Sequence, residues 1–130
     1  MTDAFIEVSG QTLNEAFEIA GIAVVDTILD IKTIESKTDK SISISAVDLK
    51  SLLYNWLEEI IILTITDGFA AKKFSVNITK AEKYTLTAII GGEPIDVDKH
   101  HFKLEVKAPT YHLMEIKQDG PIVLRFLLDL

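Results

Sequence analysis

The residue types best suited to chemistry in this sequence are oxygen donors at its end. Asp129 is the penultimate residue, and it lies next to the terminal carboxylate of Leu130. Two adjacent oxygen-bearing groups, together with a third from elsewhere in the chain, suit a hard cation such as Ca²⁺ or Mg²⁺. The alternative is a solvated and frayed terminus, because the last residues of a domain are usually poorly ordered. The pattern alone favours the frayed terminus.

The side chains that usually carry catalysis form no recognisable motif. No serine or threonine lies in a nucleophile elbow, no P-loop is present, and the chain has no cysteine. The lack of cysteine excludes a disulfide scaffold, a thiolate zinc site and a cysteine nucleophile. A hydrolase based on carboxylates has no supporting motif either. We therefore predict that the protein is not an enzyme and has no catalytic residues.

The three histidines are His100, His101 and His112. His100 and His101 are adjacent, so on an extended chain their rings point in different directions and make a poor chelate. His112 follows Tyr111 on a predicted strand, where we expect it to be packed or to face a partner. The histidines therefore predict no metal centre of their own.

The length and charge of the chain limit the classes to which it can belong. A chain of 130 residues has the usual size of one domain, and no linker or repeat divides it, so residues 1–130 are expected to fold together. The formal net charge of −7 argues against a general binder of phosphate backbones and favours docking to a basic partner. The longest apolar run, 60–63, is far below the ~20 residues that span a bilayer, and residues 1–10 do not resemble a secretory signal. We expect a soluble, cytoplasmic protein without membrane contact.

Two segments have the periodicity of helices. Thr12 and Glu15 form a capping box, after which apolar residues recur at intervals of three and four, beginning at Leu13 and ending near Asp30. Asp48 is the expected cap of a second helix, whose apolar stripe continues to Ile61. Each stripe predicts a helix with a buried face.

Other segments alternate with a period of two, as half-buried strands do. A strand-helix-strand-helix order followed by a run of strands predicts an α+β fold, with both helices on one face of a largely antiparallel sheet. Gly91-Gly92 is interpreted as a bend at the end of a strand, and 95–101 as a polar loop. The expected strands are 5–8, 41–46, 74–78, 84–90, 102–117 and 122–128.

Five strings of residues, spread over nearly the whole chain, together match one known family. They are Gly10-Gln11-Thr12-Leu13-Asn14-Glu15-Ala16-Phe17, Leu52-Leu53-Tyr54-Asn55-Trp56-Leu57-Glu58-Glu59, the Gly92-Glu93-Pro94 loop with Asp98-Lys99-His100, Glu105-Val106-Lys107-Ala108-Pro109-Thr110-Tyr111-His112, and the ending Phe126-Leu127-Leu128-Asp129-Leu130. In these strings the chain resembles the archeases, small proteins that assist the GTP-dependent tRNA-splicing ligase. The string that begins at Glu105 and the Asp-Leu ending are specific in combination.

The resemblance implies a strand-helix-strand-strand type fold and a role in RNA ligation. Archeases promote guanylylation of the active-site histidine of the ligase and allow repeated turnover. The expected function is therefore that of a non-catalytic activator in tRNA splicing, which binds the ligase and contacts tRNA only indirectly. A metal-independent, chaperone-like interaction module is the alternative, and the oligomeric state stays open.

The resemblance also implies a divalent-ion site, usually described as calcium. The family's site uses an N-terminal aspartate seven residues before a turn glycine, the penultimate aspartate and the last residue, and Asp3 lies seven residues before Gly10. The implied ligands are therefore Asp3, Asp129 and Leu130, and the implied cofactor is Ca²⁺ or another divalent cation. Such an ion would order the last strand, which reverses the preference for a frayed terminus. The sequence keeps the aspartate of the family's N-terminal motif but lacks the histidine before it.

The matching strings also supply the implied partner-binding or accessory residues. Lys107 either contacts the ligase or a phosphate, or is an ordinary lysine on the surface of a strand. The full set is His100, Glu105, Lys107 and His112.

Overall fold

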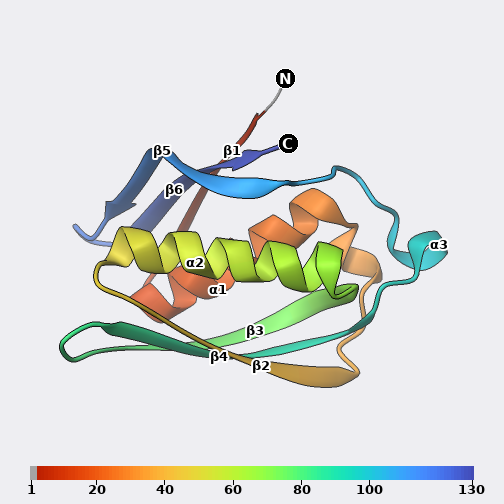
Figure 1. Cartoon of the computed structure of the whole chain (residues 1–130), viewed down its shortest axis with the longest axis horizontal. Helices are drawn as coiled ribbons and strands as arrows, with labels where there is room; N and C mark the ends of the chain where they lie inside the picture. Colours follow the sequence, from red (N-terminus) through yellow and green to blue (C-terminus); the bar gives the residue numbers. More distant parts are fainter. Residues whose placement is uncertain (1–2) are drawn as a thin grey trace.

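The computed structural model of the protein describes residues 3–130, in which two helices lie between two antiparallel sheets (Figure 1). The helical elements are α1 (Leu13–Ile28), η1 (Ile31–Thr33), α2 (Leu49–Ile61), η2 (Ile62–Thr66) and α3 (Val97–His100). The strands are β1 (Asp3–Gly10), β2 (Thr38–Ala46), β3 (Phe69–Lys80), β4 (Tyr84–Pro94), β5 (Ala108–Lys117) and β6 (Ile122–Asp129). No helix in the described part of the chain has the length and apolar character needed to cross a membrane.

The strands divide between two sheets where the sequence predicted one. Their orders are β1-β6-β5 and β2-β4-β3, and every pairing is antiparallel. The α+β class and the antiparallel pairing are thus confirmed, and the helices lie on one face of each sheet. Two sheets form because α1 buries residues on more than one side, packing against β3 on one side and against β1 and β6 on the other.

Both long helices begin where the sequence predicted. The Thr12 hydroxyl accepts a hydrogen bond from the Glu15 N–H at 3.1 Å, and the Glu15 carboxylate accepts one from the Gln11 N–H at 3.1 Å. Asp48 accepts a hydrogen bond from the Ser51 N–H at 2.8 Å, which is the main reason why the pKa of Asp48 is lowered. These side chains satisfy main-chain donors that the first turn of a helix leaves free.

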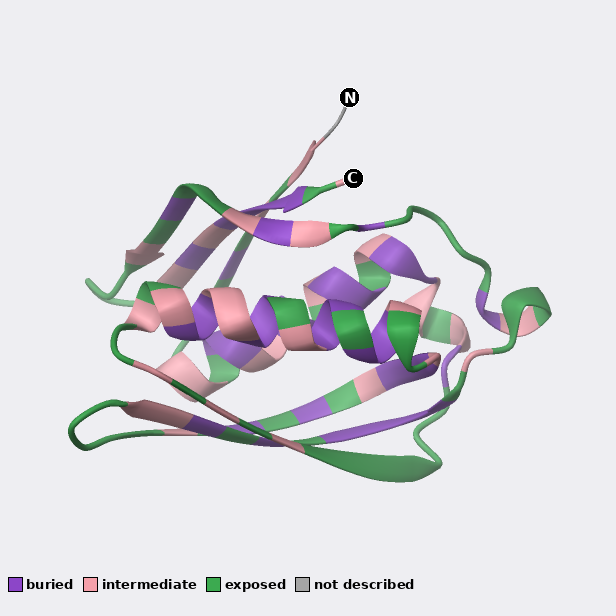
Figure 2. Ribbon diagram, in the orientation of Figure 1, coloured by how far each residue is buried: buried purple, intermediate pink, exposed green. Residues whose placement is uncertain are grey.

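The core fills the space between the three layers. Figure 2 shows the buried stripes of α1 and α2 alternating with exposed positions along each helix. Trp56 is fully buried, and its indole N–H donates to the Phe17 carbonyl at 2.9 Å. The Phe74 ring meets Trp56 edge to face with centroids 6.0 Å apart, and it also packs against Gly21, where a Cβ would lie only 2.9 Å from the ring. This contact fixes α1, α2 and β3 against one another.

The segment from 91 to 107 differs most from the prediction. Gly91 and Gly92 do not bend the chain at the end of a strand but continue β4, and a Cβ at Gly92 would lie 2.0 Å from the carbonyl of Ala70 on β3. Glycine is therefore needed there for close strand pairing. The predicted polar loop contains α3, and the predicted strand 102–117 is paired only from Ala108 onwards, apart from a single bridge between Phe102 and Leu29.

Candidate functional site

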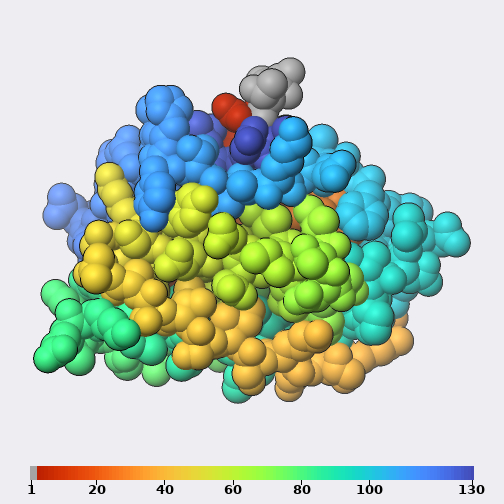
Figure 3. All heavy atoms as spheres, in the orientation of Figure 1, coloured from red at the N-terminus to blue at the C-terminus, as the bar shows by residue number. Residues whose placement is uncertain are grey.

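The first and last strands bring the two ends of the chain together. β1 and β6 are antiparallel neighbours, and Asp3 lies directly opposite Asp129 in their register. In Figure 3 the red atoms of the N-terminal strand adjoin the dark blue atoms of the C-terminal strand at one end of the molecule. Strand pairing therefore places side by side two carboxylates that are almost the whole chain apart in sequence.

Asp129 is held from both sides because β6 is the central strand of its sheet. Its register partner on β5 is Ala108, and its carbonyl accepts a hydrogen bond from the Lys107 N–H at 2.8 Å. The frayed terminus that the pattern favoured is not observed, since the last strand is paired as far as Asp129. The Asp129 side chain itself is exposed.

The carboxylates of Asp3 and Asp129 share one face of the sheet. Directly opposite residues in an antiparallel pair have Cβ atoms about 4.5–5.5 Å apart, and like charges in such a pair destabilise it. Within residues 3–130, no basic side chain forms an ion pair with either aspartate. A cation bound between the two carboxylates would remove this repulsion.

The available donors fit a hard cation but do not complete its coordination. Asp3, Asp129 and the terminal carboxylate of Leu130 all offer oxygen, the ligand that Ca²⁺ and Mg²⁺ prefer. In the described part of the chain, no three His, Cys, Asp or Glu side chains come close enough together to hold an ion. Because Ca²⁺ takes about six to eight oxygens, water or a partner would have to supply the others.

The carboxylate pair belongs to the first of four cross-strand rows on the outer face of sheet β1-β6-β5. Residues two apart on a strand share a face, and the alternate residues of β6 are fully buried in the core. The second row is apolar and the third is ionic. The four rows are Asp3–Asp129–Ala108, Phe5–Leu127–Thr110, Glu7–Arg125–Glu115 and Ser9–Val123–Lys117.

Arg125 links all three strands in the ionic row. Its Nε bonds to the Glu7 carboxylate, and its Nη1 lies 3.4 Å from Glu115 Oε2. These bonds, first of all the one to Glu7, raise the pKa of Arg125. The row beside the apolar row therefore holds one guanidinium paired with two carboxylates.

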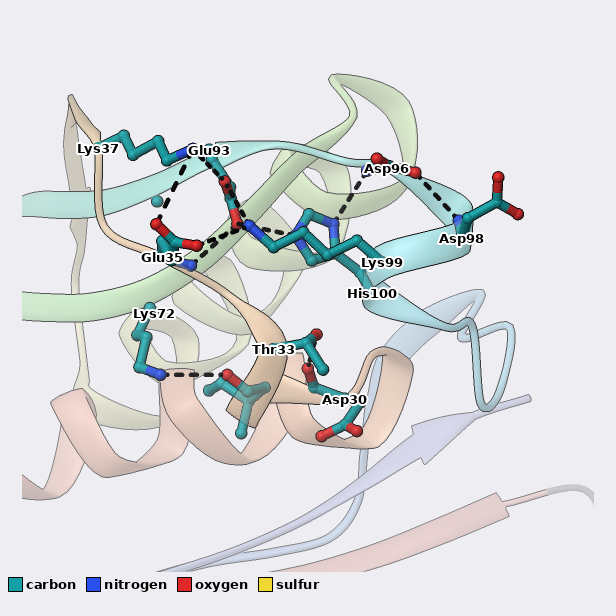
Figure 4. Close-up of polar contacts among 12 residues, drawn as sticks. Asp30, Thr33, Glu35, Lys37, Lys72, Glu93, Asp96, Asp98, Lys99 and His100 are labelled. Atoms are coloured by element: carbon teal, nitrogen blue, oxygen red, sulfur yellow. Dashed lines mark hydrogen bonds and ion pairs between the residues drawn. The ribbon is translucent and has the colours of Figure 1, made fainter.

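A second cluster of charges lies where α3 meets the end of β4 (Figure 4). Glu93 is only 5% exposed, and it accepts hydrogen bonds from the Glu35 N–H at 2.9 Å and from Lys99 Nζ at 2.9 Å. The Glu35 amide, then Lys99 and then His100 hold the pKa of Glu93 far below its ordinary value of 4.5. The same contacts with Glu93 and Glu35 raise the pKa of Lys99.

His100 is fully buried in this cluster and uses both ring nitrogens. Nδ1 accepts a hydrogen bond from the Asp96 N–H at 2.9 Å, so the ring proton is on Nε2, which lies 2.9 Å from Glu93 Oε2. A ring bonded in this way can neither bind a metal nor face a partner. His100 instead joins α3 to β4, so its position is that of a structural, accessory residue.

The other implied accessory residues are exposed but do not form one site. The main chain of Lys107 pairs with Asp129, which places this lysine beside the carboxylates. Glu105 lines an open groove of about 360 Å³ formed with Ile65 and residues 102–104. His112 lies in the irregular part of β5, where its N–H donates to the Thr110 hydroxyl at 3.1 Å.

The sequence motifs did not predict a functional role for Phe5, Arg125 or Leu113. The period-two alternation of the terminal strands was the available signal for Phe5 and Arg125, because it puts both on the face that carries the carboxylates. Leu113 has a φ of 58°, in the left-handed region that leucine rarely adopts, and no sequence pattern predicts this.

Comparisons with known proteins agree over the whole chain. The family model described as "Archease protein family (MTH1598/TM1083)" matches residues 1–130. Protein archease of Pyrococcus abyssi is 43% identical over 110 residues, which cover 84% of this chain and 78% of that protein. Protein archease of Pyrobaculum islandicum is 38% identical over 130 residues, which cover 98% of this chain and 88% of that protein.

Solved structures give the same result. The solution structure of protein 1598 of Methanobacterium thermoautotrophicum is 36% identical, with a TM-score of 0.86 and coverage of 100% of this chain and 94% of that one. The crystal structure of an archease from Thermotoga maritima, described as a possible chaperone, is 21% identical and has a TM-score of 0.64. The match covers 99% of this chain and 91% of that chain, and it shows the same fold. With a family match over its full length and relatives of this identity, the chain belongs to the archease family.

Proposed function

We propose that this archease is a non-catalytic activator of the GTP-dependent tRNA-splicing ligase, which promotes guanylylation of the ligase's active-site histidine and its repeated turnover. The protein binds the ligase and contacts tRNA only indirectly. The observation that supports the proposal best is the position of Asp3 directly opposite Asp129, at an exposed end of a sheet. We assign the binding of Ca²⁺ or another divalent ion to these two residues and to Leu130.

Guanylylation is a phosphoryl transfer, for which positioning and charge neutralisation supply most of the acceleration. When bound, a divalent ion supplies positive charge for the triphosphate. The protein's own contribution is to hold two like-charged carboxylates on one face and to leave them accessible. The hydrogen bond from Lys107 N–H to the Asp129 carbonyl keeps the last strand in position for this. An activator of this kind needs no nucleophile of its own.

Lys107 and Glu105 lie in the chain segment that leads into β5. Both side chains are exposed, and Lys107 follows directly from the buried Val106. We assign to Lys107 a contact with the ligase or with a phosphate, because its side chain is exposed and its main chain is bonded to that of Asp129. We assign secondary contacts with the ligase to Glu105 and His112, which are both exposed.

The test is a guanylylation assay with purified ligase, GTP and a divalent ion. Asp129→Asn keeps the shape of the side chain and removes its charge, and we expect it to reduce stimulation by at least about 10–100-fold. Asp119→Asn is the matched control, since Asp119 is an exposed aspartate in the turn at the opposite end of the β5–β6 hairpin. Full stimulation by the Asp129 variant would exclude the proposed role.

Exposed apolar side chains favour a second candidate, a metal-independent chaperone-like module. Phe102, Leu104 and Tyr111 are 47%, 45% and 51% exposed. Calorimetric titration of the protein with Ca²⁺ separates the two functions. Stoichiometric binding that Asp129→Asn abolishes supports the activator, whereas stimulation of the ligase without any ion binding supports the chaperone-like module.

A further inference from the structure

The outer face of sheet β1-β6-β5 is not an ordinary solvated sheet surface. Phe5 is 55% exposed in the row next to the carboxylates. Its neighbour Leu127 is only 6% exposed, although it lies on the outer face and is separate from the main core. An apolar row therefore adjoins the proposed ion site directly.

An irregular part of β5, the strand next to β6, carries a second exposed apolar side chain. The register of β5 with β6 shifts between Thr110, which belongs to the apolar row, and Glu115, which belongs to the ionic row. The extra residues include Leu113, which is 59% exposed and has a φ of 58°. A leucine in the left-handed region destabilises the fold, and its exposed side chain gains no burial in exchange.

We propose that Phe5 and Leu113 anchor this face to the ligase, so that the carboxylates of Asp3 and Asp129 enter its nucleotide-binding mouth. This inference rests on the proposed function and names the surface through which it operates. The first three rows then have separate tasks: the carboxylates reach the ion and triphosphate, the apolar row docks, and the ion pairs of Arg125 with Glu7 and Glu115 border the contact.

The chemistry of the face indicates what the bound surface of the ligase must offer. Asp3, Asp129 and the terminal carboxylate require a rim that carries positive charge, which a triphosphate site has in any case. Phe5 and Leu113 require an apolar recess beside that rim, because a few buried aromatic or aliphatic anchors carry most of the energy of an interface. A second copy of this acidic face fits poorly, since it would bring carboxylates against carboxylates.

Leu113→Gly gives the sharpest test, because two opposite effects are expected. Glycine tolerates a φ of 58°, so the variant should melt at a higher temperature than the wild type. At the same time it lacks the anchor, so the concentration that gives half-maximal stimulation of the ligase should rise about tenfold or more. If Leu113 had a merely structural role, the variant would show a lower melting temperature together with weaker binding to the ligase.

His101→Gly is the matched control for backbone strain. His101 has a φ of 54°, it is exposed, and it follows α3, which lies at the far right of Figure 1, away from the bulge in β5. This variant should also melt at a higher temperature while its half-maximal concentration stays the same. If Leu113→Gly loosens the bulge, Leu113→Asn serves the same purpose, because asparagine tolerates left-handed backbone.

Phe5→Ala tests the other anchor, with Ile89→Ala as its control. Ile89 is 54% exposed, close to the 55% of Phe5, but it lies on the other sheet. We expect Phe5→Ala to raise the half-maximal concentration about tenfold or more, with maximal stimulation unchanged at saturation, and Ile89→Ala to leave both unchanged. If Phe5→Ala and the Leu113 variants match their controls while the wild type stimulates, the docking face is wrong and the activator role stands. If the wild type does not stimulate the ligase, the proposed function itself fails.

Discussion

The two carboxylate clusters of this protein differ in how fully the chain satisfies them. Glu93 is nearly buried, and it bonds to the Glu35 amide, to Lys99 and to the ring of His100. Asp3 and Asp129 are brought together by two strands, and in residues 3–130 neither has an ion-pair partner. A carboxylate whose oxygens all accept hydrogen bonds stabilises the fold. Two adjacent carboxylates without a positively charged partner in the chain are suited to bind a cation or a positively charged partner.

The largest expected effect comes from breaking the satisfied cluster. Glu93→Ala leaves the Nε2–H of the fully buried His100 without its acceptor and removes one of the two carboxylates that bind the ammonium of Lys99. We expect the melting temperature to fall by about 10 °C or more. Differential scanning calorimetry measures it, with Glu35→Ala as the control, because the Glu35 side chain is 64% exposed and should contribute only about 0–1 kcal/mol. An equal fall in melting temperature for Glu93→Ala and Glu35→Ala would contradict the stabilising role of the Glu93 cluster.

The pH dependence of unfolding tests the same cluster. Because the folded-state pKa of Glu93 lies below its ordinary value of 4.5, its contribution is complete above that value and is lost as the pH falls through the folded-state pKa. We therefore expect urea unfolding between about pH 7 and pH 2 to give a larger free energy of unfolding for the wild type than for Glu93→Gln. This difference should grow as the pH rises towards about 4.5 and stay constant above it. A difference in free energy of unfolding that does not change with pH would show that Glu93 acts through packing rather than charge.

Calcium tests the open pair. An ion that binds only the folded state stabilises it by about 2.7 kcal/mol when its concentration is 100 times the dissociation constant. Adding Ca²⁺ should therefore raise the melting temperature of the wild type and leave that of Asp129→Asn unchanged. Glu35→Gln, which removes a carboxylate elsewhere, should still respond. An equal response from wild type and Asp129→Asn would place the ion somewhere else.

The smallest expected effect has the opposite sign from the loss at Glu93. Without a divalent ion, Asp129→Asn removes the repulsion from Asp3 and should stabilise the protein by about 0.2–1 kcal/mol. Chemical denaturation in the presence of a chelator measures this difference. Asp119→Asn should change the free energy of unfolding by less than about 0.5 kcal/mol. A clear loss of stability in Asp129→Asn would mean that this carboxylate is already satisfied within the chain.

Local patterns predicted much of the fold and only part of each site. The capping residues Thr12 and Asp48 marked the helix starts correctly, because capping depends on neighbours within one turn. The family resemblance implied the pair of Asp3 and Asp129, and the strand register shows that they meet. The cluster around Glu93 was not predicted, since Glu35 is 58 positions away and nothing in the sequence marks it as a partner.

The sequence by itself determined the α+β class, the long helices and strands, and the oxygen donors at the chain end, because these follow from short-range periodicity and side-chain chemistry. The tertiary structure alone decided that the strands divide into two sheets, that His100 is buried, and that Phe5 lies in the row next to the carboxylates. The physical reason is that strand register and burial depend on contacts between segments far apart in the chain. A local pattern cannot specify such contacts until the whole core has formed.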